Sequence, residues 1–374
     1  MFFVLSHRYE RATLCRDVAR SRVELCQICN ANEAIAMNNT SISEMQKFHF
    51  GSKIFCSDGE EGILIRVGFD PTTRTMTHIG IRQGRFFGKN VYLPYNTVTN
   101  ASGEGVTLRI TSADVLAASK NAPSGCIFLD NKSVVEASVG HGSNGNGRGT
   151  VSIVAVHPEC GKLSYIVAHH LRPGQDTLLY QEYITKIETD RVVVSISEAL
   201  LHNLPAYRPD RELQQEVERA LFELTQLHVD FKGMTIRVLD SILYLNGNIS
   251  SSLRGDIVQD QAMGVPGLLE IKNNLLGDDT LAANLAAALG SDERTHDLPI
   301  GVYPKLGVVR LSGAVHTPQQ KAVAEEIART FPGVRGVTNT LVVDSKADMI
   351  HVMSSAEGGE TNDLIPGKYI RHTK

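Results

Sequence analysis

The sequence lacks tryptophan altogether and has no apolar stretch approaching the roughly eighteen residues that a membrane-spanning helix needs. Its six cysteines are scattered over 374 residues without forming a disulfide framework, so reduced thiols in a cytoplasm are expected. The opening run MFFVL is stopped at once by His7 and Arg8, and a secretory signal needs a longer apolar core. We therefore expect a cytoplasmic protein, with peripheral attachment to the inner membrane face kept open.

Strong charge of either sign is also missing. The net charge is -4, which is too small to imply any partner. Residues 45–120 are the most basic part, with 9 basic and 6 acidic side chains, a net +3. No segment has the dense basic surface that would dominate binding to nucleic acid or anionic lipid.

Motifs that carry chemistry are absent as well. The sequence has no Gly-x-Ser-x-Gly elbow, no His-Glu-x-x-His and no Walker-type loop. The glycine-rich HGSNGNGRG at 141–149 precedes an expected strand instead of a helix, which favours a flexible loop over a phosphate cradle. Cys26 and Cys29 form one CxxC pair, whereas a structural zinc site usually needs two. We predict a protein that is not an enzyme, with no catalytic, cofactor-binding or metal-binding residues; zinc at that pair is the alternative.

What the sequence does contain is repetition. Shifting the chain by 66 positions aligns two C-terminal segments without a gap, which indicates a tandem duplication. The matching pairs are Leu245 and Leu311, Gly247 and Gly313, Ile249 and Val315, Pro266 and Pro332, Gly267 and Gly333, Ile271 and Val337, Asn273 and Asn339, and Leu275 and Leu341.

Each copy reads as α-β-β-α-β. In the first copy an apolar face at helical spacing predicts the opening helix, and two strands, MTIRVLD and ILYLNGNI, follow. In the second copy Thr317 is the expected N-cap of the later helix, with Pro318 at its first position and Gln320 completing a capping box. Ser251 occupies the matching cap position of the first copy. The face of the opening helix is Leu213, Val217, Ala220, Leu221 and Leu224.

These segments resemble a tandem of BON domains (bacterial OsmY and nodulation). The features that carry the resemblance are the LxGx(V/I)x(S/T) segment, the helix after it and the Pro-Gly turn before the last strand. It covers about residues 211–344. The resemblance implies a non-catalytic module that binds phospholipid or mediates assembly at membranes, and it gives Gly247, Gly267, Gly313 and Gly333 a structural role in turns.

A second repetition, at an offset of 87, lies in the middle of the chain. Two segments align at this offset, GILIRVGFDPTTRTMTHIGI and GTVSIVAVHPECGKLSYIVA, with Gly62 matched to Gly149 and Pro71 to Pro158. Short strands between turns predict small barrels. This rhythm resembles the PRC-barrel fold, which is found in a subunit of the photosynthetic reaction centre and in a ribosome-maturation factor.

The predicted architecture is therefore multidomain: two small all-β PRC-like barrels followed by two α+β domains of BON type. The boundaries that we predict are a leader at 1–44, which is disordered or an over-long start, barrels at 45–120 and 121–204, a linker at 205–210, BON domains at 211–276 and 277–344, and a disordered tail at 345–374.

One loop of the first barrel is the predicted contact surface. Arg82, Arg85 and Lys89 accompany Phe86 and Phe87 there, a mixture of cations and aromatic rings suited to docking. The alternative is that the loop has no binding role, with its charges solvated and one phenylalanine buried. The function that we predict is a binding or adaptor protein associating with phospholipid or a membrane-associated protein, without a small-molecule substrate. The alternative is binding of RNA or a ribosomal protein through the first barrel, and a homo-oligomer is a third reading.

Overall fold

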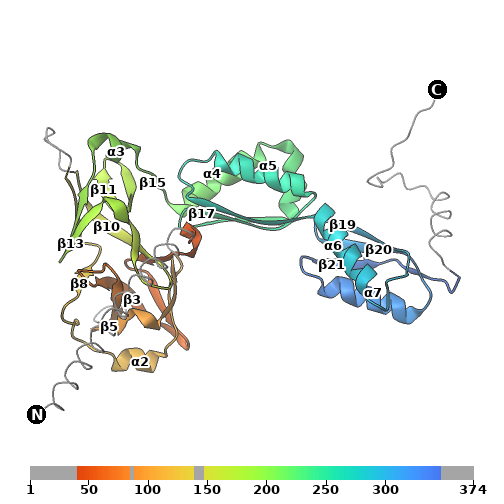
Figure 1. Cartoon of the computed structure of the whole chain (residues 1–374), viewed down its shortest axis with the longest axis horizontal. Helices are drawn as coiled ribbons and strands as arrows, with labels where there is room; N and C mark the ends of the chain where they lie inside the picture. Colours follow the sequence, from red (N-terminus) through yellow and green to blue (C-terminus); the bar gives the residue numbers. More distant parts are fainter. Residues whose placement is uncertain (1–39, 85–87, 139–146, 347–374) are drawn as a thin grey trace, which may run out of the picture. The chain divides into compact units, whose positions relative to one another are not determined.

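The computed structural model describes residues 40–84, 88–138 and 147–346, and the chain divides into two compact units. The first unit runs to Leu213 and also includes Val238–Ile242 and Gly267–Glu270. The second holds Gln214–Arg237, Leu243–Pro266 and the chain from Ile271 onward. The protein is multidomain and β-rich (Figure 1). Among the described residues, no helix combines the length and the apolar character needed to cross a membrane.

The first unit contains two β repeats with the same strand order. In the first, the sheet order is β5-β4-β3-β2-β7-β6, and in the second it is β12-β11-β10-β9-β14-β13. In both, the last strand of the repeat pairs in parallel with its first: β7 with β2, and β14 with β9. The bounds are β1 (Gln46–His49), β2 (Lys53–Cys56), β3 (Gly59–Phe69), β4 (Met76–Gln83), β5 (Asn90–Pro94), β6 (Val98–Ser102), β7 (Gly105–Leu108), α2 (Ser112–Ala117), β8 (Ile127–Leu129), β9 (Val134–Ser138), β10 (Gly147–Val156), β11 (Leu163–Arg172), β12 (Gln175–Tyr180), β13 (Ile184–Glu188), β14 (Arg191–Ser195) and α3 (Glu198–Asn203).

The two repeats exchange their leading strands. β1 precedes the first repeat in sequence but pairs with β10 of the second, and β8 precedes the second repeat but pairs with β3 of the first. The buried side chains of both repeats accordingly form one continuous hydrophobic cluster, in which Phe48 of β1 and Leu129 of β8 are fully buried. The exchange crosses the predicted boundary at residue 120. The exchanged strands pair where the long strands are otherwise free on that side: β9 pairs with the first part of β10 and β1 with the last, and β2 and β8 divide β3 in the same way.

Two segments expected to lie outside the domains also contribute structure. Within the predicted linker, β15 (Ala206–Tyr207) adds a strand to β12. Within the predicted leader, residues 40–44 are described and include a 3-10 turn, η1 (Ile42–Glu44). Ile42 packs against a small core cluster of the second repeat. Residues 1–39, with the CxxC pair, and the tail from 347 lie outside the described residues.

The tip of the β16–β17 hairpin belongs to the first unit. Asp240 and Ser241 both have positive φ, of 54° and 61°, as a two-residue type I′ turn requires. The carboxylate of Asp210 accepts the backbone N–H groups of both, each at 2.8 Å. The Asp240 carboxylate is itself buried and lies 2.6 Å from the imidazole Nε2 of His49 on β1. An aspartate at the turn therefore satisfies polar groups in two elements far apart in sequence.

The C-terminal part has the predicted element order α-β-β-α-β twice over. The first series is α4 (Asp210–Phe222), β16 (Met234–Leu239), β17 (Ile242–Ile249), α5 (Ser252–Met263) and β18 (Glu270–Gly277). The second is α6 (Asp278–Ser291), β19 (Ile300–Lys305), β20 (Val308–Val315), α7 (Pro318–Thr330), β21 (Gly336–Asn339) and β22 (Val342–Val343). The sheet orders correspond, β16-β17-β18 and β19-β20-β21. The last strand, expected as one run, is broken into β21 and β22.

Local helix signals are confirmed. Thr317 is the N-cap of α7, Pro318 occupies the first turn and Gln320 completes the capping box; Ser251 caps α5. These bonds satisfy backbone N–H groups that the start of a helix leaves without partners. On α4 the predicted apolar face is buried at Leu213, Val217 and Leu221.

Candidate functional site

The candidate site is the open sheet face of the C-terminal domain. Helices α6 and α7 cover one face, where Leu281, Leu285 and Leu289 pack against Val309 and Leu311 of β20. Successive strand residues point to opposite faces, so the neighbours of the buried β20 residues lie on the other side. Val308 there is 47% exposed, and no helix of this domain packs over it. In the preceding copy, α4 and α5 likewise lie together on one side of β17 (Figure 1).

A cation and a tyrosine occupy the middle of this open face. Tyr303 of β19 pairs across the sheet with Arg310 of β20, which pairs in turn with Thr338 of β21. The guanidinium carbon of Arg310 lies 5.2 Å from the ring centroid of Tyr303, within the range of a cation–π contact. Tyr303 is 42% exposed, and Arg310 is exposed too. We use "Tyr–Arg face" for Tyr303, Arg310 and Thr338.

The first copy has related residue types at the same positions. The offset of 66 takes Tyr303 back to Arg237 and Arg310 back to Tyr244, so that the aromatic and cationic residues have exchanged strands. Thr338 corresponds to Lys272. Sequence reasoning missed this pairing because it compared the two copies for identical or chemically similar residues at each position. A search of each copy for one aromatic and one cationic residue on neighbouring strands would have found it.

Predicted glycines hold the backbone geometry that this sheet needs. Gly247 and Gly313 have φ of 112° and 119°, a region closed to other residues. At Gly313 an added Cβ would overlap the carbonyl oxygen of Pro299. Their structural role was predicted, but they lie inside β17 and β20 and not in turns. Gly267 and Gly333, with φ of 101° and 87°, do lie in the turns that follow α5 and α7.

A matched asparagine ties the last strand of each copy to its helix. Asn339 Nδ2 donates to the Lys321 carbonyl and to Glu325 Oε2, both at 3.0 Å, and its Oδ1 accepts from the Leu341 N–H at 3.1 Å. In the other copy Asn273 makes the same three kinds of contact: its Nδ2 donates to Gly255 O at 3.3 Å and to Gln259 Oε1 at 3.1 Å, and its Oδ1 accepts from the Leu275 N–H at 3.2 Å. The hydrogen bond from Asn339, followed by that from Arg329, lowers the pKa of Glu325.

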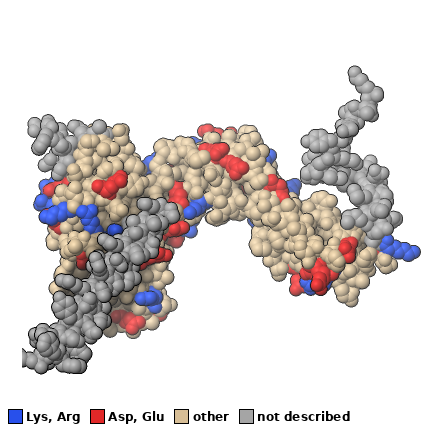
Figure 2. Space-filling view, viewed as in Figure 1, with Lys and Arg blue, Asp and Glu red and all other residues tan. Residues whose placement is uncertain are grey.

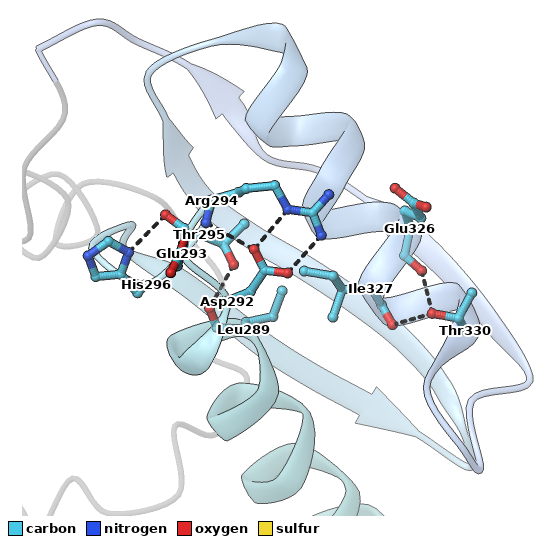
Figure 3. Close-up of polar contacts among 9 residues, drawn as sticks. All are labelled: Leu289, Asp292, Glu293, Arg294, Thr295, His296, Glu326, Ile327 and Thr330. Carbon is cyan, nitrogen blue, oxygen red and sulfur yellow. Dashed lines mark hydrogen bonds and ion pairs between the residues drawn. The ribbon is translucent and has the colours of Figure 1, made fainter.

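The connection from α6 to β19 is fixed by its own polar groups (Figure 3). Arg294 reaches both carboxylate oxygens of Asp292, at 2.9 and 2.7 Å, and these bonds lower the pKa of Asp292 to about 2. Thr295 Oγ1 donates to the Leu289 carbonyl at 2.7 Å and so closes the end of α6. In Figure 2 acidic side chains gather over α7, whereas most of the surrounding surface is neither acidic nor basic. Within this connection the carboxylate of Asp292 is thus held by Arg294.

The predicted contact loop is only partly described. Arg82 is exposed at the end of β4, and Lys89 is exposed just before β5. Arg85, Phe86 and Phe87 lie outside the described residues. Arg82 lines a surface pocket together with Arg66 and Lys132, two residues that sequence reasoning did not single out. They come from separate elements, β3 and the turn after β8, so no local pattern links them.

Metal ligands do not cluster in the described ranges. No group of three or more His, Cys, Asp or Glu side chains in residues 40–84, 88–138 and 147–346 is placed to hold an ion. The free thiols described there are Cys56, Cys126 and Cys160.

Comparison with known proteins identifies one domain. The BON domain family matches residues 277–345, so the chain contains a BON domain there. Osmotically-inducible protein Y of Escherichia coli (strain K12) is 26% identical over 150 residues, which cover 36% of this chain and 73% of that protein. Two solved structures of CdsD, a structural protein of the type III secretion system of Chlamydia trachomatis, are 16% identical, with TM-scores of 0.30. They cover 39% and 41% of this chain, and 66% and 70% of theirs.

Proposed function

We propose that this is a non-catalytic binding protein that attaches to phospholipid surfaces through the open sheet faces of two BON domains. The observation that carries the proposal is the Tyr–Arg face on the domain at 277–345. Tyrosine and basic residues are favoured at the membrane–water interface, because the ring sits among headgroups and the cation meets lipid phosphate.

The second BON domain is part of the proposal. Residues 211–276 have the same element order and sheet order as the family match, and the same strained glycine inside the middle strand. The alignment with osmotically-inducible protein Y, at 150 residues, is longer than a single domain of this size. In the same sense, the two β repeats are proposed to be PRC-barrel domains, since they share strand order and the offset of 87. They would join the BON modules to a further partner, which is the adaptor role.

Charge decides what kind of attachment is expected. The chain carries a net charge of -4, so long-range attraction to anionic lipid is weak. Binding therefore depends on the local face, with a cation contacting phosphate and the tyrosine ring inserted beside it. We further propose that the protein acts in the cytoplasm, at the inner membrane face.

Co-sedimentation of the full chain with liposomes tests this function. Vesicles with and without phosphatidylglycerol are compared at low salt, using the native chain, the double variant Tyr303→Ser/Arg310→Ser and a control, Arg219→Ser. Arg219 is an exposed arginine on α4, on the helical side of the other copy. The face variant is expected to bind less than the native chain, because one of the two proposed faces is removed, and the control is expected to bind as the native chain does. Equal loss in both, or no binding by the native chain to any composition, would reject the proposal.

The alternative is RNA or ribosomal-protein binding through the first β repeat. It rests on the exposed Arg82 and Lys89 and on the net +3 of residues 45–120. Pull-down with ribosomal RNA, with both residues changed to serine, separates the two functions. Recovery that is unaffected by the change counts against the loop.

A further inference from the structure

A pocket on the first β repeat is lined by an excess of positive charge. Its volume is about 390 Å³, within the range of small-molecule sites. Arg66, Arg82 and Lys132 line it together with a single carboxylate, Asp130. Three cations and one anion leave the lining with a charge of +2.

The sheet register places two of these cations on the same surface. Arg66 pairs with Gly80 of β4, and Arg82 lies two residues further along the same strand. Residues two apart on a strand, and partners across strands, share a face. Gly80 has no side chain to crowd Arg66, because a Cβ added at Gly80 would lie only 3.2 Å from the Arg66 Cβ. Asn90 pairs with Arg82 from β5 and adds an amide to the same wall.

The turn after β8 supplies the opposite wall and is internally fixed. Asp130 Oδ1 accepts the Lys132 N–H at 2.9 Å, and the Asp130 N–H donates to Ser133 Oγ at 2.8 Å. Asp130 Oδ2 accepts from Arg66 Nε at 3.2 Å. This bond uses one edge of the guanidinium and orients it, and the side chain of Arg66 remains 41% exposed. The carboxylate thus positions one arginine without neutralising the pocket.

We propose that this pocket binds the phosphomonoester group of a small organic phosphate. A phosphomonoester carries about 1.5 to 2 negative charges near neutral pH, which matches the +2 of the lining. Guanidinium groups bind phosphate oxygens through paired N–H donors, and an ammonium group adds a point charge. The partly buried Phe50, Ile63 and Ile65 line the same pocket and provide apolar contact for the organic part.

The site is independent of the proposed BON function, because it lies on other residues of the chain. Calorimetric titration of the full chain with phenyl phosphate, phenyl sulfate and inorganic phosphate tests it. We expect phenyl phosphate to bind more tightly than phenyl sulfate, which has the same shape and a single charge. Inorganic phosphate should bind more weakly than phenyl phosphate, because it lacks the apolar group. Equal binding of phenyl phosphate and phenyl sulfate, or none of either, overturns the proposal.

Variants locate the binding. Arg82→Gln should weaken phenyl phosphate binding by about tenfold or more, since a charge-assisted pair of hydrogen bonds is lost. Arg109→Gln, at an exposed arginine outside the pocket, should leave it unchanged. Equal effects of Arg82→Gln and Arg109→Gln on phenyl phosphate binding would show that the pocket is not the site.

Co-sedimentation with vesicles distinguishes a phosphate on a lipid headgroup from a phosphate on a soluble molecule. If the natural group is a lipid headgroup, Arg82→Gln should also reduce co-sedimentation with phosphatidic acid vesicles. If it is soluble, that binding should be unchanged while phenyl phosphate binding falls. In either case Tyr303→Ser/Arg310→Ser should leave phenyl phosphate binding intact. Failure of the BON proposal and failure of this one therefore give different results.

Discussion

Removing the side-chain amide of Asn339 should loosen α7 measurably. The Asn339→Ala change deletes three hydrogen bonds, two donated to Lys321 O and Glu325 Oε2 and one accepted from the Leu341 N–H. Each is worth about 1 kcal/mol net, and partial solvation of Glu325 reduces its share, so we expect a loss of about 2–3 kcal/mol in local stability. At 1.4 kcal/mol per factor of ten, this corresponds to a roughly 30- to 150-fold larger population of the open helix.

Amide hydrogen exchange of peptides from α7 reports this opening directly, without assuming that the whole chain unfolds in one step. Asn284→Ala on α6 is the matched control: Asn284 is exposed, and alanine is the better helix former, so little or no destabilisation is expected there. A second readout is the pKa of Glu325, which should rise toward its ordinary value when the donor is lost. If α7 exchanges less than about threefold faster than in the control and Glu325 titrates unchanged, the asparagine does not hold the helix as described.

Three further outcomes are expected. Gly313→Ala should destabilise the β19–β20 pair by about 3 kcal/mol or more, because alanine at φ 119° is strained and its Cβ meets the carbonyl of Pro299; wild-type exchange in these strands would contradict this. Burial raises the pKa of Tyr95 from 10.0 to about 12, so its contribution to stability is present below pH 10 and is lost as the pH rises through 12. The phenolate absorbance of the native protein and that of Tyr95→Phe should therefore coincide near pH 10 and separate as the pH approaches 12. The carboxyl of Asp292, with a pKa of about 2, contributes stability above pH 3.8 that is lost as the pH falls through 2. Arg294→Gln should return that pKa toward 3.8, as a carboxyl NMR titration would record.

Features set by neighbouring residues were predictable. The capping box at Thr317 and Gln320, and the buried face of α4, depend on contacts within a few positions along the chain. The 66-residue repeat then fixed where strands should recur. For the BON domain, the sequence signal and the structural elements therefore agree.

Pairing between distant strands was not predictable in this way. Nothing within the four residues of β1 specifies that its partner is β10 instead of a strand of its own repeat. The same holds for the phosphate pocket, whose cations Arg66, Arg82 and Lys132 are brought together only by the sheet and by the turn after β8. Sequence reasoning found Arg82 because of its local basic and aromatic neighbours. The other two lacked such neighbours.

The exchanged leading strands have a consequence for how the chain is made. When β1 has been synthesised, the residues of β10 that pair with it, Ile153–Val156, are still more than a hundred residues from synthesis. At usual translation speeds β1 waits several seconds without its partner, exposing the apolar Phe48 meanwhile. Neither repeat is complete until the other has emerged. A truncated chain ending between them should thus be prone to aggregation, and the pair should fold slowly as one cooperative body.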